Sequence, residues 1–435
     1  MNYQATIDYL YNQLPMFSRT GSSAIKKGLD NTLELCALLD NPQQKFKSIH
    51  VGGTNGKGST SHMLAAILQT AGYKTGLYTS PHLRDFRERI RINGQMISEQ
   101  AVIDFVANHK ADFERIEPSF FEMTVGFAFD YFARAGVDIA LIEVGLGGRL
   151  DSTNVITPLL SIITNIGWDH MNVLGNTLPL IAAEKAGIIK PNVPVIIGEY
   201  QPEVAEVFKE KAREENAPIK FASEELVVSA ESGIENQETG LRQVTVRSNN
   251  DPLTPTARRF VLDLTGSYQL KNLKTVLVAV DELREQGFDI SDEHIATALK
   301  QVRTLTGLNG RWQTLNEHPL TICDTGHNPD GIAEVLQNIA SVPHQQLHFV
   351  IGMVNDKDIS KVLNMLPKDA IYYFCRPDIP RGLDAGELQQ QAATFSLKGE
   401  TYPSVKDALK AAQANATDAD LVFAGGSTFV VAEIV

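Results

Sequence analysis

Hydrophobic residues along the chain form short continuous runs that alternate with longer stretches of helical spacing. Runs such as "VDIALIEVG", "LLSIITNIG" and "VPVIIG" are apolar over most of their length, as expected of strands buried on both faces of a parallel sheet, and "FKSIHVGG" is a shorter apolar run. Stretches such as "STSHMLAAILQTAG" repeat apolar residues every three to four positions, which predicts helices that cover such a sheet. Strands that alternate with helices favour an α/β fold with a mainly parallel sheet and right-handed crossovers.

The pattern changes in two places, and these changes suggest how the chain is divided. Residues 224–265 contain short alternating segments interrupted by Gly, Asn and Pro, which predicts a small antiparallel insertion. A second α/β pattern begins near residue 312, after a stretch rich in Gly, Thr and Asn that is typical of a hinge. We therefore expect a first domain over residues 1–303, a hinge over 304–311 and a Rossmann-like α/β domain over 312–435.

The segment between the first buried run and its helix is a candidate phosphate-binding loop, "GGTNGKGST" (residues 52–60). The general spelling G-x-x-x-x-G-K-[ST] requires Gly at position 51 and Ser or Thr at position 58, where this chain has Val51 and Gly58. The loop still lies where backbone N–H groups and the helix dipole attract an anion. A purely structural turn remains the alternative. If the loop binds nucleotide, the first domain is a P-loop domain and the binding residues are Gly53, Thr54, Asn55, Gly56, Lys57, Gly58 and Ser59.

Two further polar positions follow buried runs of the first domain. Glu143 ends one run and is followed by glycines, so its carboxylate suits Mg²⁺ at the edge of the sheet. An ion pair with Arg149 is the structural alternative. Asp169 and His170 follow another run, although a single histidine at such a position is more often a buried structural residue.

Lys185 and a loop of the second domain are weaker candidates from the residues alone. Helical periodicity places Lys185, in "IAAEKAGIIKP", on the protein surface. The loop "CDTGHNPDG" puts Asp324, His327 and Asn328 between a strand and a helix. Helix capping alone would explain Asp324 or Asn328.

Composition excludes several other classes of protein. The formal net charge is −13, which argues against a general nucleic-acid-binding protein. The N-terminal residues contain no basic residue before Arg19, unlike a signal peptide, and no apolar run approaches the ~18 residues that a membrane span needs. The three cysteines are widely spaced and indicate neither a disulfide framework nor a metal site. We expect a cytoplasmic protein with no membrane or nucleic-acid partner.

These segments occur together in an order that resembles the folylpolyglutamate synthase/dihydrofolate synthase family of the Mur-ligase superfamily. "GTNGKGS" is the spelling of the phosphate loop in that superfamily, whereas the segments around "TSPHL" and "EVGLGGRLDSTN" point to its folate branch, of the bacterial bifunctional type. The matching segments span nearly the whole chain: "GTNGKGS", "YTSPHLRDFRERIRING", "FFEMTVGFAFDYFA", "EVGLGGRLDSTN", "DHMNVLGNTLPLIAAEKAGIIK", "DTGHNP", "GMVNDKD" and "GGSTFVVAE".

The resemblance implies an ATP-dependent ligase that adds L-glutamate to dihydropteroate, to the γ-carboxylate of reduced folates, or to both. A carboxylate is a poor electrophile, so the γ-phosphoryl group of ATP first converts it to an acyl phosphate, which the amine of glutamate attacks. Phosphoryl transfer depends mostly on positioning and charge neutralisation, which explains a phosphate loop and two Mg²⁺ sites. Such an enzyme would act on small molecules, and we expect it to be a monomer.

The resemblance also implies roles for single residues. Ser80 and Glu143 would bind one Mg²⁺ and His170 the second. Lys185 would be carbamylated and would act with His170 and His327 as a catalytic residue, against the surface position that periodicity predicts. Further implied contacts are Asn272, Arg311 and Asp324 with the nucleotide, and Phe121, Arg149 and Asp151 with the pterin-bearing substrate.

Two other classes of protein remain as alternatives. A Mur-type peptide ligase acting on a UDP-sugar would share the phosphate loop, but no UDP-binding N-terminal domain is evident, since the loop begins about 50 residues into the chain. A non-catalytic nucleotide switch would also share it, although the second α/β domain and the second metal-ligand candidate disfavour that class.

Overall fold

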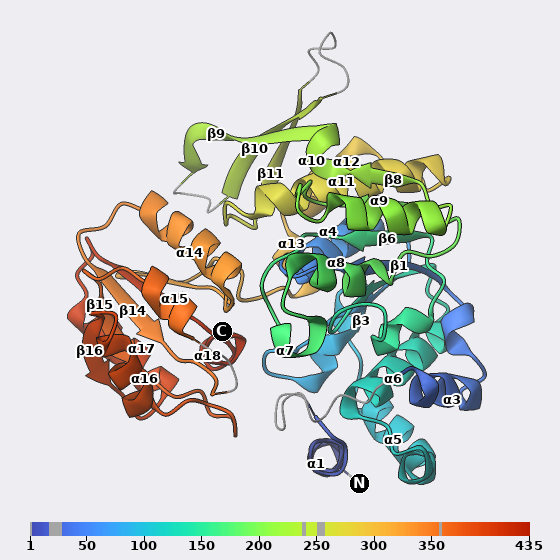
Figure 1. The fold of residues 1–435 in the computed structure, drawn as a ribbon, viewed down its shortest axis with the longest axis horizontal. Coiled ribbons are helices and arrows are strands. Elements are labelled where there is room, and N and C mark those ends of the chain that lie inside the picture. The colour runs from blue at the N-terminus through green and yellow to red at the C-terminus, as the bar shows by residue number, and fades with distance from the viewer. Residues whose placement is uncertain (1, 17–27, 237–240, 250–256, 356–358) are drawn as a thin grey trace. The chain divides into compact units, whose positions relative to one another are not determined.

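A mainly parallel sheet of eight strands lies at the centre of the first part of the chain, in the order β4-β3-β2-β5-β1-β6-β7-β8 (Figure 1). In this computed structural model, residues 2–16, 28–236, 241–249, 257–355 and 359–435 are described. Neighbouring strands from β2 to β8 in this order pair in parallel, whereas β3 pairs antiparallel with β2 and β4 pairs antiparallel with β3. The sheet predicted from the apolar runs is confirmed. Its strands are β1 (Lys47–Gly52), β2 (Thr75–Tyr78), β3 (Ile90–Ile92), β4 (Gln95–Met96), β5 (Ile139–Glu143), β6 (Leu160–Ile163), β7 (Val195–Ile197) and β8 (Ile219–Phe221).

Helices cover both faces of this sheet, because its central strands are buried on both sides. The helices of this part are α1 (Tyr3–Gln13), α3 (Asp30–Leu38), η2 (Pro42–Gln44), α4 (Lys57–Thr70), η3 (Phe86–Arg89), α5 (Glu99–Ile116), α6 (Phe120–Ala135), η4 (Ser152–Val155), α7 (Met171–Leu174), α8 (Leu178–Ala186), α9 (Ala205–Glu214), α10 (Ala222–Glu225), α11 (Gln269–Glu285), α12 (Asp292–Leu299) and α13 (Val302–Thr306). Helix α13 occupies part of the stretch expected to be a hinge.

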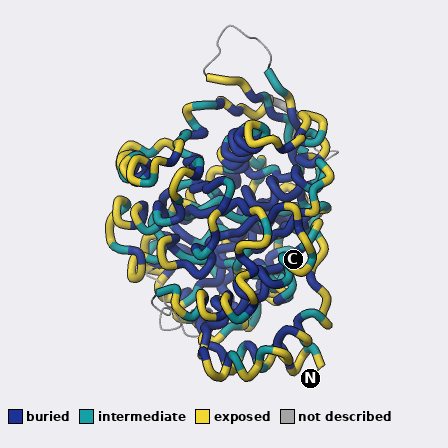
Figure 2. Tube along the Cα trace, turned by 90° about the vertical axis from the view of Figure 1, so that its right-hand side faces the viewer, coloured by how far each residue is buried: buried dark blue, intermediate teal, exposed yellow. Residues whose placement is uncertain are grey.

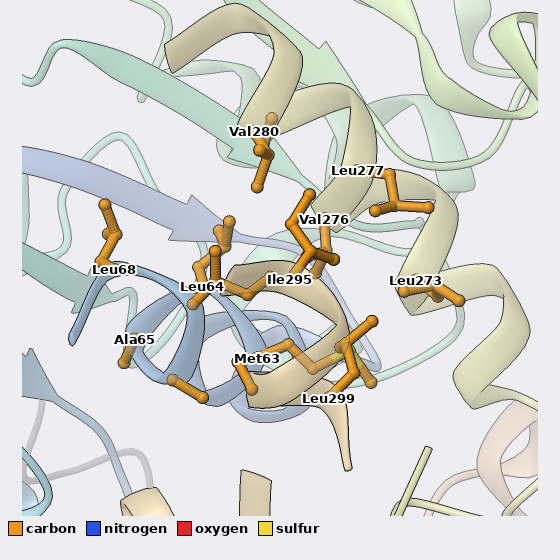
Figure 3. Close-up of a cluster of buried hydrophobic side chains, with 14 of the residues drawn as sticks. Met63, Leu64, Ala65, Leu68, Leu273, Val276, Leu277, Val280, Ile295 and Leu299 are labelled. Carbon is orange, nitrogen blue, oxygen red and sulfur yellow. The ribbon is translucent and has the colours of Figure 1, made fainter. Parts of the chain in front are cut away.

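Helix α4, which follows the phosphate loop, is buried on nearly all sides. Every residue from Ser59 to Leu68 is buried, which is typical of a helix enclosed by other elements. Its apolar side chains pack with those of α11 and α12, for example Met63 and Leu64 with Val276 and Ile295 (Figure 3). The packing fixes the N-terminus of α4, and therefore the loop that precedes it, against the rest of the core.

An antiparallel sheet of three strands, in the order β11-β10-β9, is inserted between β8 and α11. It packs through β9 against α11, and its inward residues Val244, Val246 and Phe260 join the same core as α4. The predicted antiparallel insertion is confirmed for the residues described here. The strands are β9 (Leu226–Asn236), β10 (Leu241–Ser248) and β11 (Arg258–Leu262).

The chain folds into two compact units, and residues 309–435 form most of the second. The sheet of the second unit has the order β12-β13-β17-β14-β15-β16, in which only β12 pairs antiparallel. The second α/β fold is thereby confirmed. Its elements are β12 (Gln313–Glu317), β13 (Leu320–Cys323), α14 (Pro329–Ser341), β14 (Leu347–Ile351), α15 (Ser360–Met365), β15 (Ile371–Phe374), α16 (Ala385–Ala393), β16 (Lys398–Thr401), α17 (Val405–Asn415), β17 (Leu421–Gly425) and α18 (Thr428–Ala432).

Burial follows the pattern that the sequence predicts for layered α/β units. The central strands are buried along their length, and Figure 2 shows exposed residues recurring on the turns of the trace between buried ones. Within the described ranges, no helix combines the length and the apolar character needed to cross a bilayer. The last three residues of the "GMVNDKD" segment, 356–358, lie outside the described residues.

Candidate active site

The phosphate loop joins β1 to α4 and requires glycine at two positions. Gly53 has φ +134° and Gly56 has φ +86°, a region that residues with a Cβ atom rarely adopt. A Cβ atom at Gly53 would lie 1.9 Å from Thr164 Oγ1, and one at Gly56 would lie 2.3 Å from Asn272 Oδ1. The loop is thus pressed against the segment after β6 on one side and against α11 on the other.

The N-terminus of α4 offers its backbone N–H groups beside the loop. Gly56 is the N-cap residue, and its position carries no side-chain cap hydrogen bond. The first N–H groups of a helix have no partner within the helix and carry a partial positive charge. Lys57 Nζ lies over the same loop, donating to Gly53 O at 3.2 Å and Thr54 O at 3.1 Å. This arrangement suits the phosphates of a nucleotide.

Ser80 and Glu143 lie together at the carboxyl edge of the sheet. Strands β2 and β5 are parallel neighbours, so the residues that follow them meet at the same edge. Glu143 is buried, and its Oε2 accepts a hydrogen bond from Ser80 N at 3.2 Å. The alternative ion pair with Arg149 does not form, since Arg149 pairs with Glu184 at 2.8 Å.

His170 is the N-cap residue of α7, with a left-handed backbone at φ +49°. Its Nε2 lies 3.7 Å from Asp169 Oδ2. Within the described ranges, no three His, Cys, Asp or Glu side chains form a cluster able to hold a metal ion alone. The hydroxyl of Ser80 and the carboxylate of Glu143 nevertheless fit Mg²⁺, which usually takes one or two protein oxygens and completes its shell with water and substrate phosphates.

Lys185 lies on the inner face of α8, so the surface position predicted from periodicity is wrong. Its side chain is buried, and Nζ donates to Gly53 O of the phosphate loop at 2.9 Å. Ile181, one turn earlier on the same helix, is fully buried, and residues four apart share a face. Burial, helped by the charge of Lys57, lowers the pKa of Lys185 to about 7.

The glycine-rich segment after β5 carries two of the three candidate folate contacts, Arg149 and Asp151, and the third, Phe121 of α6, packs against it. The ring of Phe121 lies against Gly145, where an added Cβ atom would be 2.4 Å from Phe121 Cζ. Arg149 is exposed and pairs with Glu184. Asp151 is buried and accepts hydrogen bonds from Leu146 N at 2.8 Å and Thr153 N at 3.0 Å, and its burial raises its pKa. In this structure Asp151 therefore braces the segment on which Arg149 lies.

The candidates of the second unit form a group of their own. Asp324 is buried, and its two oxygens accept hydrogen bonds from Trp312 N at 2.7 Å and Gly326 N at 2.8 Å. Arg311 Nη1 donates to Thr325 Oγ1. His327 Nδ1 lies 3.0 Å from Thr325 O. Asp324 thereby links the start of this unit to the loop that precedes α14.

Sequence reasoning missed several residues that hold the phosphate loop. Thr164 Oγ1 donates to Asn55 O at 2.6 Å, and Asn165 accepts from two N–H groups of the loop. Gln269 Nε2 donates to Ser59 Oγ at 3.2 Å and its Oε1 accepts from Asn272 Nδ2 at 2.8 Å. Thr164 and Asn165 follow β6, which lies beside β1 in the sheet. The sequence alone does not reveal that these two strands are neighbours, so it could not place Thr164 and Asn165 at the phosphate loop.

Comparison with known proteins identifies the class and then the family. The Mur ligase middle domain matches residues 51–280 and the Mur ligase glutamate ligase domain matches residues 310–428. Together with the phosphate loop, these matches define an ATP-dependent ligase of the Mur type, which forms C–N bonds. The chain is 32% identical to the dihydrofolate synthase/folylpolyglutamate synthase of Bacillus subtilis (strain 168) over 94% of each sequence. The chain belongs to the folylpolyglutamate synthase/dihydrofolate synthase family.

Solved structures agree with this assignment over the full chain. Escherichia coli FolC in complex with DHPP and ADP superposes with a TM-score of 0.83 at 30% identity, covering 100% of this chain and 97% of that chain. The bifunctional folylpolyglutamate synthase/dihydrofolate synthase of Yersinia pestis, complexed with AMPPNP and a Mn ion, gives a TM-score of 0.82 at 29% identity, covering 100% and 97%. These matches do not favour the UDP-sugar ligase or the nucleotide switch.

We expect Gly53→Ala to raise the KM for ATP at least about tenfold, because backbone strain at such a position costs roughly 1–3 kcal/mol and the new methyl group would displace Thr164. Steady-state kinetics with varied ATP would measure this change. Gly72→Ala is the matched control, since Gly72 also has positive φ, at +93°, but open space around the added atom. Equal KM values for the two variants would show that the contact with Thr164 does not matter.

Proposed function

We propose that this enzyme adds L-glutamate to dihydropteroate and to the γ-carboxylate of reduced folates, through an acyl-phosphate intermediate. The carboxylate attacks the γ-phosphorus of ATP and ADP leaves; the amine of glutamate then attacks the acyl carbon, and phosphate leaves with the formation of the amide bond. The observation that carries the proposal is the pairing of Ser80 with Glu143 at the edge of the sheet that also carries the phosphate loop. Phosphoryl transfer needs both a phosphate cradle and oxygen ligands for a divalent cation.

The residues of the first unit have separable roles in this reaction. Lys57 and the N–H groups at the start of α4 would hold the β- and γ-phosphates and neutralise the charge that develops during transfer. Ser80 and Glu143 would hold one Mg²⁺ and His170 a second. When bound, these ions would supply charge neutralisation for the phosphates and polarise the carboxylate. The Mn ion and AMPPNP of the Yersinia pestis relative support a divalent cation and ATP as cofactors.

Three further residues are proposed as nucleotide contacts, and a fourth as a catalytic residue. Asn272 lies beside the loop, where Gly56 leaves room for its Oδ1. Arg311, Asp324 and His327 share the loop region of the second unit described above, and we assign Arg311 and Asp324 to ATP. His327 would act with them in catalysis. These roles are supported by the matching sequence segments, which occur in this chain in the order typical of the folylpolyglutamate synthase/dihydrofolate synthase family.

We further propose that Lys185 is carbamylated in the active enzyme. A buried amine with a pKa of about 7 is largely neutral at physiological pH, and only the neutral amine attacks CO₂. The product is a carbamate anion and one proton. The carbamate would present oxygens towards the phosphate loop, where the amine now donates to Gly53 O, and would help to orient the cation or the substrate carboxylate.

Phe121, Arg149 and Asp151 would form the folate side of the site. The aromatic ring of Phe121 suits a planar pterin or aminobenzoyl group, and the exposed Arg149 suits a carboxylate. Asp151 would act by holding the segment between Gly145 and Arg149 in place. The ligand DHPP in the Escherichia coli relative supports a pterin-bearing substrate.

An assay with dihydropteroate and tetrahydrofolate side by side tests the proposed function. We expect phosphate release from ATP that depends on glutamate and on either acceptor, with a product longer by one glutamate in mass spectrometry. Turnover of only one acceptor would reduce the function to a single activity. Phosphate release that needs neither acceptor, with no folate product, would contradict the proposal.

We also propose a cytoplasmic monomer. All three cysteines, Cys36, Cys323 and Cys375, are buried and free, which suits a reducing compartment. Light scattering after size exclusion measures the mass directly: a value near the 47.7 kDa of one chain is expected, and twice that value would contradict the monomer.

A further inference from the structure

Among the residues that support the phosphate loop, Asn165, two positions after the end of β6, makes two of the hydrogen bonds. Thr54 N donates to Asn165 O at 2.9 Å, and Asn55 N donates to Asn165 Oδ1 at 2.9 Å. Both the backbone and the side chain of Asn165 therefore bind consecutive residues of the loop. Gly167 N adds a bond of 2.9 Å to Thr54 Oγ1 from the same segment.

A carboxylate fixes which way this asparagine points. Asn165 Nδ2 donates to Glu199 Oε1 at 3.0 Å, and Glu199 Oε2 lies 3.3 Å from Lys271 Nζ in the first turn of α11. An ionised carboxylate can only accept hydrogen bonds. Glu199 therefore holds the NH₂ group of the amide on its own side and leaves the amide oxygen for Asn55 N. Glu199 follows β7, so three elements meet at this bond network: β6, β7 and α11.

This network determines which donors the loop can offer to a phosphate. The N–H groups of Thr54 and Asn55 are occupied by Asn165, so an anion would use other donors, such as the N–H groups of Lys57, Gly58 and Ser59 at the start of α4. The negative charge of Glu199 would by itself oppose anion binding, and its ion pair with Lys271 at 3.3 Å offsets part of that charge while its other oxygen accepts from Asn165. We propose that Asn165 and Glu199 are positioning residues that hold the loop in the shape that binds ATP. The inference rests on the proposed ATP site.

The substitution Asn165→Asp tests whether the side-chain NH₂ group must point towards Glu199, because it replaces NH₂ by oxygen at nearly constant size. When the new carboxyl group at position 165 is protonated, its O–H can donate a hydrogen bond to Glu199 as the amide does. When it is ionised, the carboxylates at positions 165 and 199 are both acceptors and repel each other, so the loop loses its support. The charged groups around this position are Glu199 after β7, Lys271 in α11 and Lys57 in the loop. We expect the KM for ATP of this variant to rise about tenfold between about pH 5.5 and about pH 8.5, relative to the wild type over the same range.

A second substitution should reverse the effect. In the double variant Asn165→Asp/Glu199→Gln, the new amide at position 199 donates to the new carboxylate at position 165, which still accepts from Asn55 N. We expect its KM for ATP to return to within about threefold of the wild type and to lose its dependence on pH. Glu203→Gln removes the same charge from an exposed position nearby and is the matched control, for which no change is expected.

Direct titration with ADP and Mg²⁺ separates this inference from the proposed function. If the wild-type enzyme binds ADP and Asn165→Asp binds it equally well at every pH, the positioning role is wrong while the ATP site stands. If the wild type does not bind ADP, the proposed function itself fails. A melting temperature that falls in Asn165→Asp, with a KM that does not respond to pH or to Glu199→Gln, would also overturn the inference in favour of a merely structural role.

Discussion

Lys57→Ala is expected to lower kcat/KM for ATP about 10³-fold, the largest effect of any single side chain of the phosphate loop. Lys57 Nζ lies within 3.2 Å of two loop carbonyls, and it would turn towards phosphate oxygens once they are present. Removing one preorganised donor at a site of developing charge costs about 10²–10³ in rate, and here a full positive charge is removed as well. The measurement is phosphate release at varied ATP with saturating acceptor and glutamate.

The controls for Lys57→Ala distinguish charge from fold. Lys209→Ala removes a partly exposed lysine that pairs with Glu206 at 3.0 Å, and such surface pairs contribute little, so unchanged activity is expected. Lys57→Arg keeps the charge but not the shape, and should recover only part of the activity because the two side chains are not interchangeable at a tight phosphate site. An activity of Lys57→Ala within about threefold of the wild type would contradict the role of this lysine in the phosphate site.

Lys57 and Lys185 are linked through their charges. The positive charge of Lys57 contributes to the low pKa of Lys185, after burial. Without Lys57, the pKa of Lys185 should move back towards its ordinary value, and less of the amine would be neutral at a given pH. The loss of activity in Lys57→Ala would therefore include a reduced tendency of Lys185 to react with CO₂, so the two substitutions are not expected to be additive.

The sequence predicted those parts of the fold and site that depend on local patterns. The buried runs predicted the parallel sheet, and the change to alternating segments predicted the insertion that contains β9, β10 and β11. The phosphate loop could be recognised because strand, glycines, lysine and helix are contiguous in the chain. Glu143 could be placed at the edge of the sheet because it directly ends a strand.

What the sequence could not give is the order of the strands and the interactions that depend on it. Asn165 supports the phosphate loop because β6 is the neighbour of β1, although more than 100 residues separate them. Arg149 pairs with Glu184 rather than Glu143, because the segment after β5 folds back onto the end of α8. The helical pattern predicted a surface position for Lys185 because lysine is scored as a polar residue in any environment. The residue one turn earlier on the same face, Ile181, is buried, and this face of the helix points inward.

Lys185→Ala should lower kcat about 10³-fold and should be partly rescued by short carboxylates such as acetate or formate. Alanine leaves a space beside Gly53 O, and a small carboxylate can supply the oxygens that the proposed carbamate provides. Lys185→Arg is the matched control, because it keeps a long basic side chain but cannot form a carbamate and leaves less space for an added anion. Full activity of Lys185→Ala without any carboxylate would remove the role proposed for this residue.

The pH dependence gives the same proposal an independent test in the wild-type enzyme. Carbamate formation consumes the neutral amine and releases a proton, so its occupancy should rise as the pH increases through about 7, the pKa of Lys185, and fall below it. An ordinary lysine, with a pKa near 10.4, would be almost fully protonated over that range. Carbon-13 NMR after addition of labelled bicarbonate should show a carbamate signal that follows this titration and is missing in Lys185→Arg. An equal signal in both proteins would mean that a residue other than Lys185 is modified. If removal of CO₂ lowers the activity of the wild type but not that of Lys185→Arg, the carbamate is required for catalysis.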